Sequence, residues 1–173
     1  MSLKYHYEFT ASASVTAAEL EEFLHSVQKS AESLGFDPTL VLNVPFDTDD
    51  RRNLARRIGG MFTFADERLK GAKLQNPAVA CRFDPNFGDC RVFPEHGVVL
   101  VVTNDRGEEA CFGFFKFPGS IKTSRGEIPT AADGWRFSDF VQSPDRRYRE
   151  IVLQFAQAGF LKSESDEFYR SDS

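Results

Sequence analysis

The first candidate for chemistry in this sequence is a histidine and a glutamate near the N-terminus. In the alternating segment 5–10, His6 and Glu8 stand two residues apart, so they point to the same face of a strand. A carboxylate that orients an imidazole is typical of a general base. Asn43 would share this face if the first two strands of the chain were neighbours. An ordinary solvated strand face has the same pattern, and no nucleophile stands beside the pair.

A cluster of arginines follows a Ser-Pro pair at 143–144, which is typical of the start of a helix. Arg146, Arg147 and Arg149 would lie in the first turns of this helix, where positive side chains oppose the helix dipole. A bound anion would reverse that penalty, because free amides and arginine side chains together attract negative charge. The cluster therefore predicts an anion site, although Asp145 offers a neutralising charge from within the chain.

A second arginine cluster and a basic loop are further candidates for contact with an acidic partner. Arg51 and Arg52 open a segment rich in arginine, where neighbouring aspartates also offer ion-pair partners. Residues 118–134 show no periodicity, and a long segment of this kind is usually functional or mobile. Lys122 and Arg125 would line a site in this loop. Solvated helix faces and a mobile surface loop are the alternatives to these binding roles.

The cysteines predict neither a disulfide framework nor a metal site. There are three of them, which is an odd and small number for 173 residues. If residues 84–89 form a hairpin turn, Cys81 and Cys90 are diagonal neighbours about 7–8 Å apart, too far for a disulfide. A metal site would need His96 or Asp89 as a further ligand, but His96 stands in a turn one hairpin away, and the spacing matches no common zinc pattern. We expect buried, reduced thiols and no metal.

The composition indicates a soluble, mildly acidic protein of one domain spanning residues 1–173. A net charge of −5 makes nucleic acid and anionic membranes poor partners. The chain has no secretory signal and no apolar run long enough to cross a membrane, which favours a cytoplasmic location. Known phosphate-binding and catalytic motifs are absent, so no cofactor is expected. Phenylalanine supplies 18 of the 23 aromatic residues, which predicts a phenylalanine-rich core.

Two long helices have clear signals in the sequence. Residues 16–19 fit a capping box, an apolar stripe follows at helical spacing, and the Gly-Phe pair at 35–36 fits a glycine-terminated end. These signals predict a helix over about 17–34. The second helix is predicted over about 144–158, with a buried stripe of Tyr148, Ile151, Val152 and Phe155.

Between the helices the hydrophobic period changes to that of strands. The pattern predicts strands at 5–10, at 40–46 and, as a series of hairpins, within 78–117. Shorter helical segments are expected over 48–59, 66–74 and 135–141. The residues after Leu161 are polar, so the tail 162–173 is expected to fray.

These elements predict an α+β fold, with a mainly antiparallel sheet of about five to six strands packed by the N-terminal and C-terminal helices. Several strands are apolar on both faces, so both faces should be covered, or one should be buried in a homodimer. For function we favour a non-catalytic binding or regulatory module that contacts a protein partner or a small anion, because no nucleophile, base and oxyanion donors can be assembled. The alternative is a small enzyme with a site near His6 and Glu8 or in residues 118–134.

Overall fold

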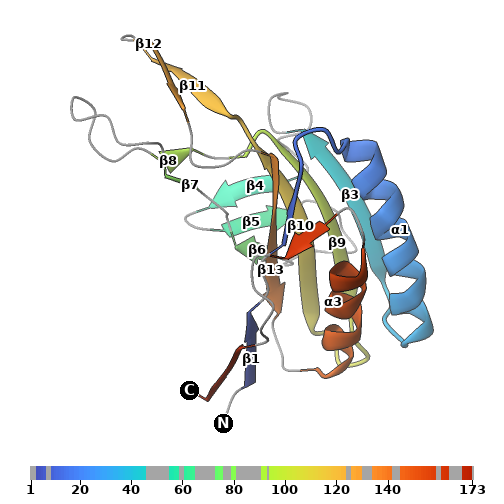
Figure 1. Cartoon of the computed structure of the whole chain (residues 1–173). Coiled ribbons are helices and arrows are strands. Elements are labelled where there is room, and N and C mark those ends of the chain that lie inside the picture. The colour runs from blue at the N-terminus through green and yellow to red at the C-terminus, as the bar shows by residue number, and fades with distance from the viewer. Residues whose placement is uncertain are drawn as a thin grey trace.

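A six-stranded antiparallel sheet forms the centre of the protein, and two helices lie on one of its faces (Figure 1). The structure is a computed structural model that describes residues 3–6, 9–45, 55–58, 61–64, 73–75, 79–80, 91–92, 94–123, 126–129, 134–141, 145–158, 161–163 and 169–172. The strands follow the order β14 (Leu161–Ser163), β2 (Phe9–Ala11), β13 (Gly134–Val141), β10 (Glu109–Phe117), β9 (His96–Thr103) and β3 (Thr39–Pro45). The α+β class predicted from the sequence is confirmed.

The first helix, α1 (Ala17–Ser33), begins and ends as the sequence predicts. The Thr16 hydroxyl accepts the Glu19 amide at 3.2 Å, and the Glu19 carboxylate accepts the Thr16 amide at 2.8 Å, which completes the capping box. At the other end Gly35 has φ +96°, and the amide of Phe36 donates to the Ala31 carbonyl at 3.1 Å. These are the contacts of a Schellman end, and they direct Phe36 into the core.

The second helix, α3 (Arg147–Gln157), carries the centre of the aromatic core. Phe155 is fully buried, and its ring centroid lies 5.2–6.3 Å from those of Phe9, Phe23, Phe112, Phe114 and Phe137. Tilted and edge-to-face pairs at these distances stabilise the core beyond the area that they bury. The phenylalanine-rich core predicted from the sequence is therefore confirmed, with α3 bringing one ring into contact with rings from three strands and α1.

The opposite face of the sheet is also buried over β9 and β10. Val99, Val101, Cys111, Phe115 and Phe117 alternate with the residues of the helix face and are at most 2% exposed. A small sheet of β4 (Ala55–Ile58), β5 (Met61–Phe64) and β6 (Lys73–Gln75) lies on this side in Figure 1, and β6 contacts β10 and β13. Both faces of β9 and β10 are thus covered within one chain, which explains why these two strands are apolar on both sides.

Three two-stranded ribbons complete the described fold. β11 (Ser120–Thr123) and β12 (Gly126–Pro129) form a hairpin that extends from the end of β10, and β1 (Leu3–His6) pairs with β15 (Tyr169–Asp172) near the two chain ends (Figure 1). The third ribbon pairs β7 (Val79–Ala80) with β8 (Arg91–Val92). Within the described residues, no helix has the length and apolar character to span a membrane.

The structure corrects several local expectations. Residues 55–58 and 73–74 are in strands, where the sequence suggested helix, and residues 134–141 form β13 instead of a helical turn. The segment 118–134 contains the β11–β12 hairpin and is not a structureless loop. In each case strand pairing provides backbone hydrogen bonds that local sequence signals do not reveal.

The two chain ends also differ from the expectation. The predicted first strand is divided into β1 and β2, which pair with different partners. The tail contributes β14 to the central sheet and β15 to the ribbon with β1, whereas the sequence suggested that it frays. The second helix begins at Arg147, so residues 143–144 do not open it and lie outside the described residues.

Candidate functional site

The candidate site is the outer side of β3, the last strand of the central sheet in the described structure. Among the described residues β9 is the strand that pairs with β3, in the register Thr39↔Val102 to Pro45↔His96. Figure 1 shows β3 beside α1, at the border of the sheet. No residue of β3 carries a charge. Pro45, at the end of the strand, is the only residue of β3 without a backbone amide proton.

The hydrogen bonds at one end of β3 determine which of its backbone groups point outward. The amide of Thr103 donates to the Pro38 carbonyl at 3.1 Å, so this pair is bonded across the ladder. In an antiparallel ladder bonded and non-bonded pairs alternate, so Leu40, Leu42 and Val44 bond to β9. The amides and carbonyls of the alternate positions therefore face away from the sheet, and these positions are Thr39, Val41 and Asn43.

Exposure agrees with an open edge. Residues 39–43 of β3 are all half-buried, whereas the neighbouring β9 is buried from Gly97 to Thr103. Leu40 and Leu42 lie on the face opposite the helices, and Val41 packs on the helix side of the core. An edge strand with unpaired backbone groups and apolar side chains is a template for another strand, and proteins usually protect such edges with charges or bulges.

A chain of polar side chains follows the seam between β3 and α1. His96 hydrogen-bonds to the Asn43 side-chain oxygen, and the Asn43 amide group donates to the Glu21 carboxylate at 3.0 Å. Because an amide oxygen only accepts, Nε2 of His96 carries the proton in this contact. Glu21 also lies 3.8 Å from the imidazole of His25, and these two side chains are 37% and 51% exposed.

The same seam continues toward the other end of β3. The side-chain amide of Gln28 donates to the Thr39 hydroxyl at 3.1 Å, and this hydroxyl donates to the Glu32 carboxylate at 2.9 Å. Gln28 in turn accepts from Nδ1 of His25 at 3.0 Å. The two glutamates therefore stand at opposite ends of the edge, Glu21 beside Asn43 and Glu32 beside Thr39. Both belong to α1, whose register on β3 fixes their positions.

His96 also contacts a buried tryptophan. The imidazole lies edge-on to the Trp135 indole with the ring centroids 5.7 Å apart, and the Lys116 ammonium lies 5.8 Å from the indole centroid. His96, Lys116 and Trp135 are opposite one another on three adjacent strands. The indole NH donates to the Val15 carbonyl at 2.7 Å, which fixes the ring beneath the start of α1. Two of the contacts of His96 are thus with the Asn43 side-chain amide and the Trp135 ring.

No family model, curated protein or solved structure matches this chain. The function is therefore inferred from the geometry of its own residues.

The arginines predicted near the second helix are arranged differently from the expectation. Arg147 donates to the Asp145 carboxylate at 2.7 Å, to Asp105 at 3.0 Å and to the Leu34 carbonyl at 3.1 Å. Its hydrogen bond holds the pKa of the Asp145 carboxyl below the usual range. Burial raises the pKa of the neighbouring Tyr148 to about 12. The charge of Arg147 is thus satisfied within the chain.

The other residues of this cluster are on the surface. Arg146 and Arg149 are exposed. The amides of Arg147 and Tyr148 donate to Asp145, and the amide of Arg149 donates to the Arg146 carbonyl. Asp145 therefore occupies the place that the sequence analysis assigned to an external anion. Anion binding by Arg146 and Arg149 stays a prediction.

Most of the remaining sequence candidates fall outside the site. His6 lies in β1, whose partner is β15, and β2 is separated from β3 by three strands, so the first strands do not bring His6 next to Asn43. Lys122 lies opposite Glu127 in the β11–β12 hairpin. Four candidates lie outside the described residues: Glu8, Arg51, Arg52 and Arg125. Catalytic and binding roles for these residues stay predictions.

The predicted arrangement of two cysteines concerns residues that the structure does not describe, since Cys81 and Cys90 lie outside the described residues. The described pairs nearest to them are Val79 with Val92 and Ala80 with Arg91, which differ by two residues from the register expected for this hairpin. The diagonal placement of the two cysteines stays a prediction. Cys111 is a buried free thiol. Among the described residues, no cluster of histidine, cysteine, aspartate and glutamate could hold a metal ion.

Sequence reasoning named Asn43 and His96 but did not connect them, and it did not name Glu21 or Glu32 as site residues. Glu21 and Asn43 are 22 positions apart in the chain, and His96 is 53 positions from Asn43. One signal was present in the sequence: β3 is an apolar strand without any charge, which is unusual for a strand at the border of a sheet.

Proposed function

We propose that this chain is a non-catalytic module that binds a protein partner by accepting an extended segment as a seventh strand at β3. The observation that carries the proposal is the set of outward backbone groups at Thr39, Val41 and Asn43 on an uncharged, half-exposed edge. Addition of a strand to an open edge is a common mode of peptide recognition, in which main-chain hydrogen bonds provide affinity and alternate side chains provide specificity.

The side chains at the edge favour a partner strand whose two faces differ, because the two faces of β3 differ. Leu40 and Leu42 would meet the side chains of the added strand on the face opposite the helices. On the other face the added strand would lie beside α1, next to Asn43 and Thr39. The edge at the other border of the sheet, β14, has three residues and offers a much shorter ladder.

Amide hydrogen exchange measured by NMR tests the proposal in the free protein first. We expect fast exchange at the amides of Thr39, Val41 and Asn43, and slow exchange at Leu40 and Leu42, which donate to β9. A synthetic peptide of alternating valine and threonine should then slow exchange at the three outward amides. Protection of these amides in the free protein would overturn the proposal, because the edge would already be covered.

N-methylation of the peptide provides a matched control that leaves the protein unchanged. Methyl groups on the peptide amides that face β3 remove the intermolecular donors, so binding should be lost. Methyl groups on the alternate amides point away from β3, so binding should be retained. Equal binding of the two methylated peptides would show contact through side chains alone and would overturn strand addition.

A further inference from the structure

The charges beside the edge define the partner more closely, and this step rests on the proposed function. We infer that the partner strand carries two cationic side chains four residues apart, one facing Glu21 and the other facing Glu32. The two glutamates lie on the helix face of β3, beside Asn43 and Thr39 respectively. A residue of the partner opposite either position would point to the same face, where the glutamates are.

The spacing of the two cations follows from the period of a strand. Asn43 and Thr39 are four residues apart, so their partners in the added strand are also four residues apart and on one face. The positions between them would meet Leu40, Val41 and Leu42. The sequence of the preferred segment is therefore cationic, apolar, β-branched, apolar, cationic. Threonine or valine suits the central position, because it would lie beside Val41 on the helix face.

The glutamates retain capacity to accept a cation. Glu21 receives one hydrogen bond from Asn43, and Glu32 receives one from Thr39, while an ionised carboxylate has about four acceptor positions. The other titratable groups at this seam are His25, 3.8 Å from Glu21, and His96, which hydrogen-bonds to the Asn43 side chain. A lysine or arginine opposite Asn43 would therefore meet a carboxylate that is partly exposed and already oriented by its bond to Asn43.

The same charges disfavour a second copy of this chain as the occupant. In a symmetric antiparallel pair centred on Val41, Asn43 of one copy would lie opposite Thr39 of the other. Glu21 would then lie near Glu32 of the second copy, and the two carboxylates would repel each other. The chain also has an overall charge of −5, which favours a basic partner over self-association.

Three peptides that differ in the number and spacing of their lysines test the inference by titration calorimetry at low ionic strength. One peptide has lysine at both positions, one has threonine, and one has lysines two residues apart. We expect the first to bind about tenfold more tightly than the second, and the third to lose most of this advantage. The advantage should decrease as salt is added, because exposed charge pairs are screened.

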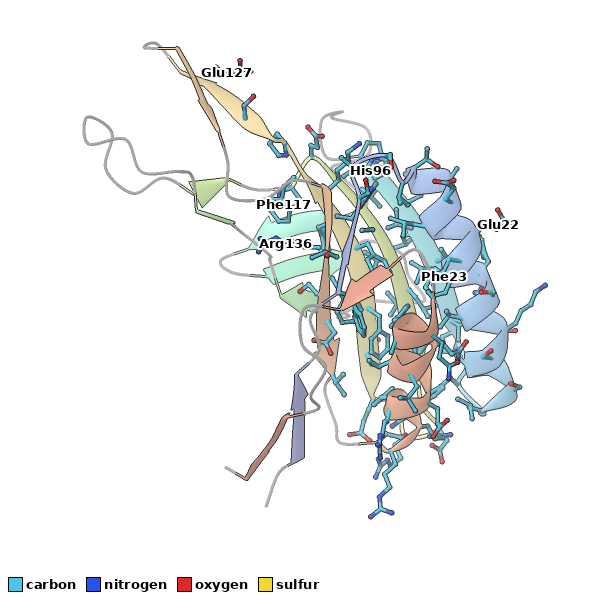
Figure 2. The ribbon with its side chains drawn as sticks, in the orientation of Figure 1. Glu22, Phe23, His96, Phe117, Glu127 and Arg136 are labelled. Carbon is cyan, nitrogen blue, oxygen red and sulfur yellow. The ribbon has the colours of Figure 1, made fainter. Side chains whose placement is uncertain are left out.

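Protein variants locate the effect on the two glutamates. The double variant Glu21→Gln/Glu32→Gln should remove most of the lysine advantage while the threonine peptide binds as before. Glu22→Gln is the matched control, because Glu22 is exposed on α1 without a described bond to β3, and it points away from the sheet in Figure 2. Glu22→Gln changes the net charge by one unit, so it is compared with the single variants Glu21→Gln and Glu32→Gln, which change the charge by the same amount.

The outcomes separate this inference from the proposed function. If the lysine and threonine peptides protect the outward amides and bind equally, the cationic preference is wrong and strand addition stands. If neither peptide protects the outward amides, strand addition itself is wrong. The protein could also sediment as a dimer in which spin labels at position 41 of the two copies lie close together. A second copy of the chain would then occupy the edge, and the inference of a basic partner would be overturned.

Discussion

The guanidinium of Arg147 lies 4.5 Å from the centre of the Phe36 ring and joins the end of α1 to the start of α3. Phe36 is stacked on Tyr148 at 5.2 Å, so the three side chains form one layer between the helices. Arg147 also donates to the Leu34 carbonyl, one of the groups left without a partner at the end of α1. Because α1 carries the glutamates of the β3 seam, this contact helps to fix the position of the candidate site.

Replacement of Arg147 by alanine should lower the free energy of unfolding by about 2–4 kcal/mol, because Asp145 would lose its ion-pair partner and Leu34 its donor. Asp145 is only 10% exposed, so water replaces the lost contacts poorly. Arg146→Ala is the matched control, since Arg146 is exposed and its side chain makes no capping bond. The control should stay within about 0.5 kcal/mol of wild type in a urea melt. Equal losses of stability in the two variants would contradict a stabilising role for the contacts of Arg147 with Asp145 and Leu34.

Stability should also fall in acid through Asp145. The hydrogen bond from Arg147 lowers the pKa of this carboxyl in the folded state. A depressed pKa stabilises the folded protein above the unfolded value of about 3.9, and this contribution is lost as the pH falls below that value toward the folded pKa. The difference in unfolding free energy between wild type and Asp145→Asn should therefore be constant from pH 7 to about 5 and shrink below about pH 4. A difference that stays constant down to pH 2.5 would contradict this assignment.

Phe23→Ala should destabilise the protein by about 2–3 kcal/mol, at the lower end for a large core residue. Phe23 is partly buried, and its ring lies 5.6 Å from Phe155 between the two helices (Figure 2). Its neighbour Glu22 is exposed, so Glu22→Ala should change stability by less than about 0.5 kcal/mol. Chemical denaturation of both variants checks the pair. A loss below about 1 kcal/mol for Phe23→Ala would mean that this ring does not contribute to the core.

Gly134→Ala should be among the most damaging single-methyl additions. Gly134 has φ +99°, and an added Cβ would lie 2.4 Å from the Ala11 carbonyl oxygen. The contact is with backbone of β2, which cannot move without breaking its pairing with β13, so a loss of about 3 kcal/mol or more is expected. In Gly119→Ala the new methyl meets nothing within 4 Å. Thermal melts should show Gly119→Ala within about 1 kcal/mol of wild type. A similarly small effect of Gly134→Ala would contradict the close approach of Gly134 to the backbone of β2.

Local signals in the sequence were sufficient for the bounds of α1, for the presence of α3 and for one of the hairpins expected within 78–117, whose turn lies at residues 104–107. The capping box, the Gly35 end and the turn glycine Gly107 at φ +76° are all formed by residues close together in the chain. Contacts of this range are encoded by side-chain chemistry at fixed offsets, so reading the residues predicts them. The sequence therefore determined where α1 begins and ends and that β9 and β10 form a hairpin.

The sequence alone did not determine which strands become neighbours. Residues 135–141 were predicted to be a short helical segment, and they form β13 because β10 and β2 pair with this strand on its two sides. The same tertiary pairing left β3 at the border of the sheet and placed Asn43 between Glu21 and His96. Strand order depends on the packing of the whole core and on long-range loop closure, whereas the chemistry of each strand is local. The uncharged character of β3 was thus present in the sequence, and only the tertiary structure placed this strand at the border of the described sheet.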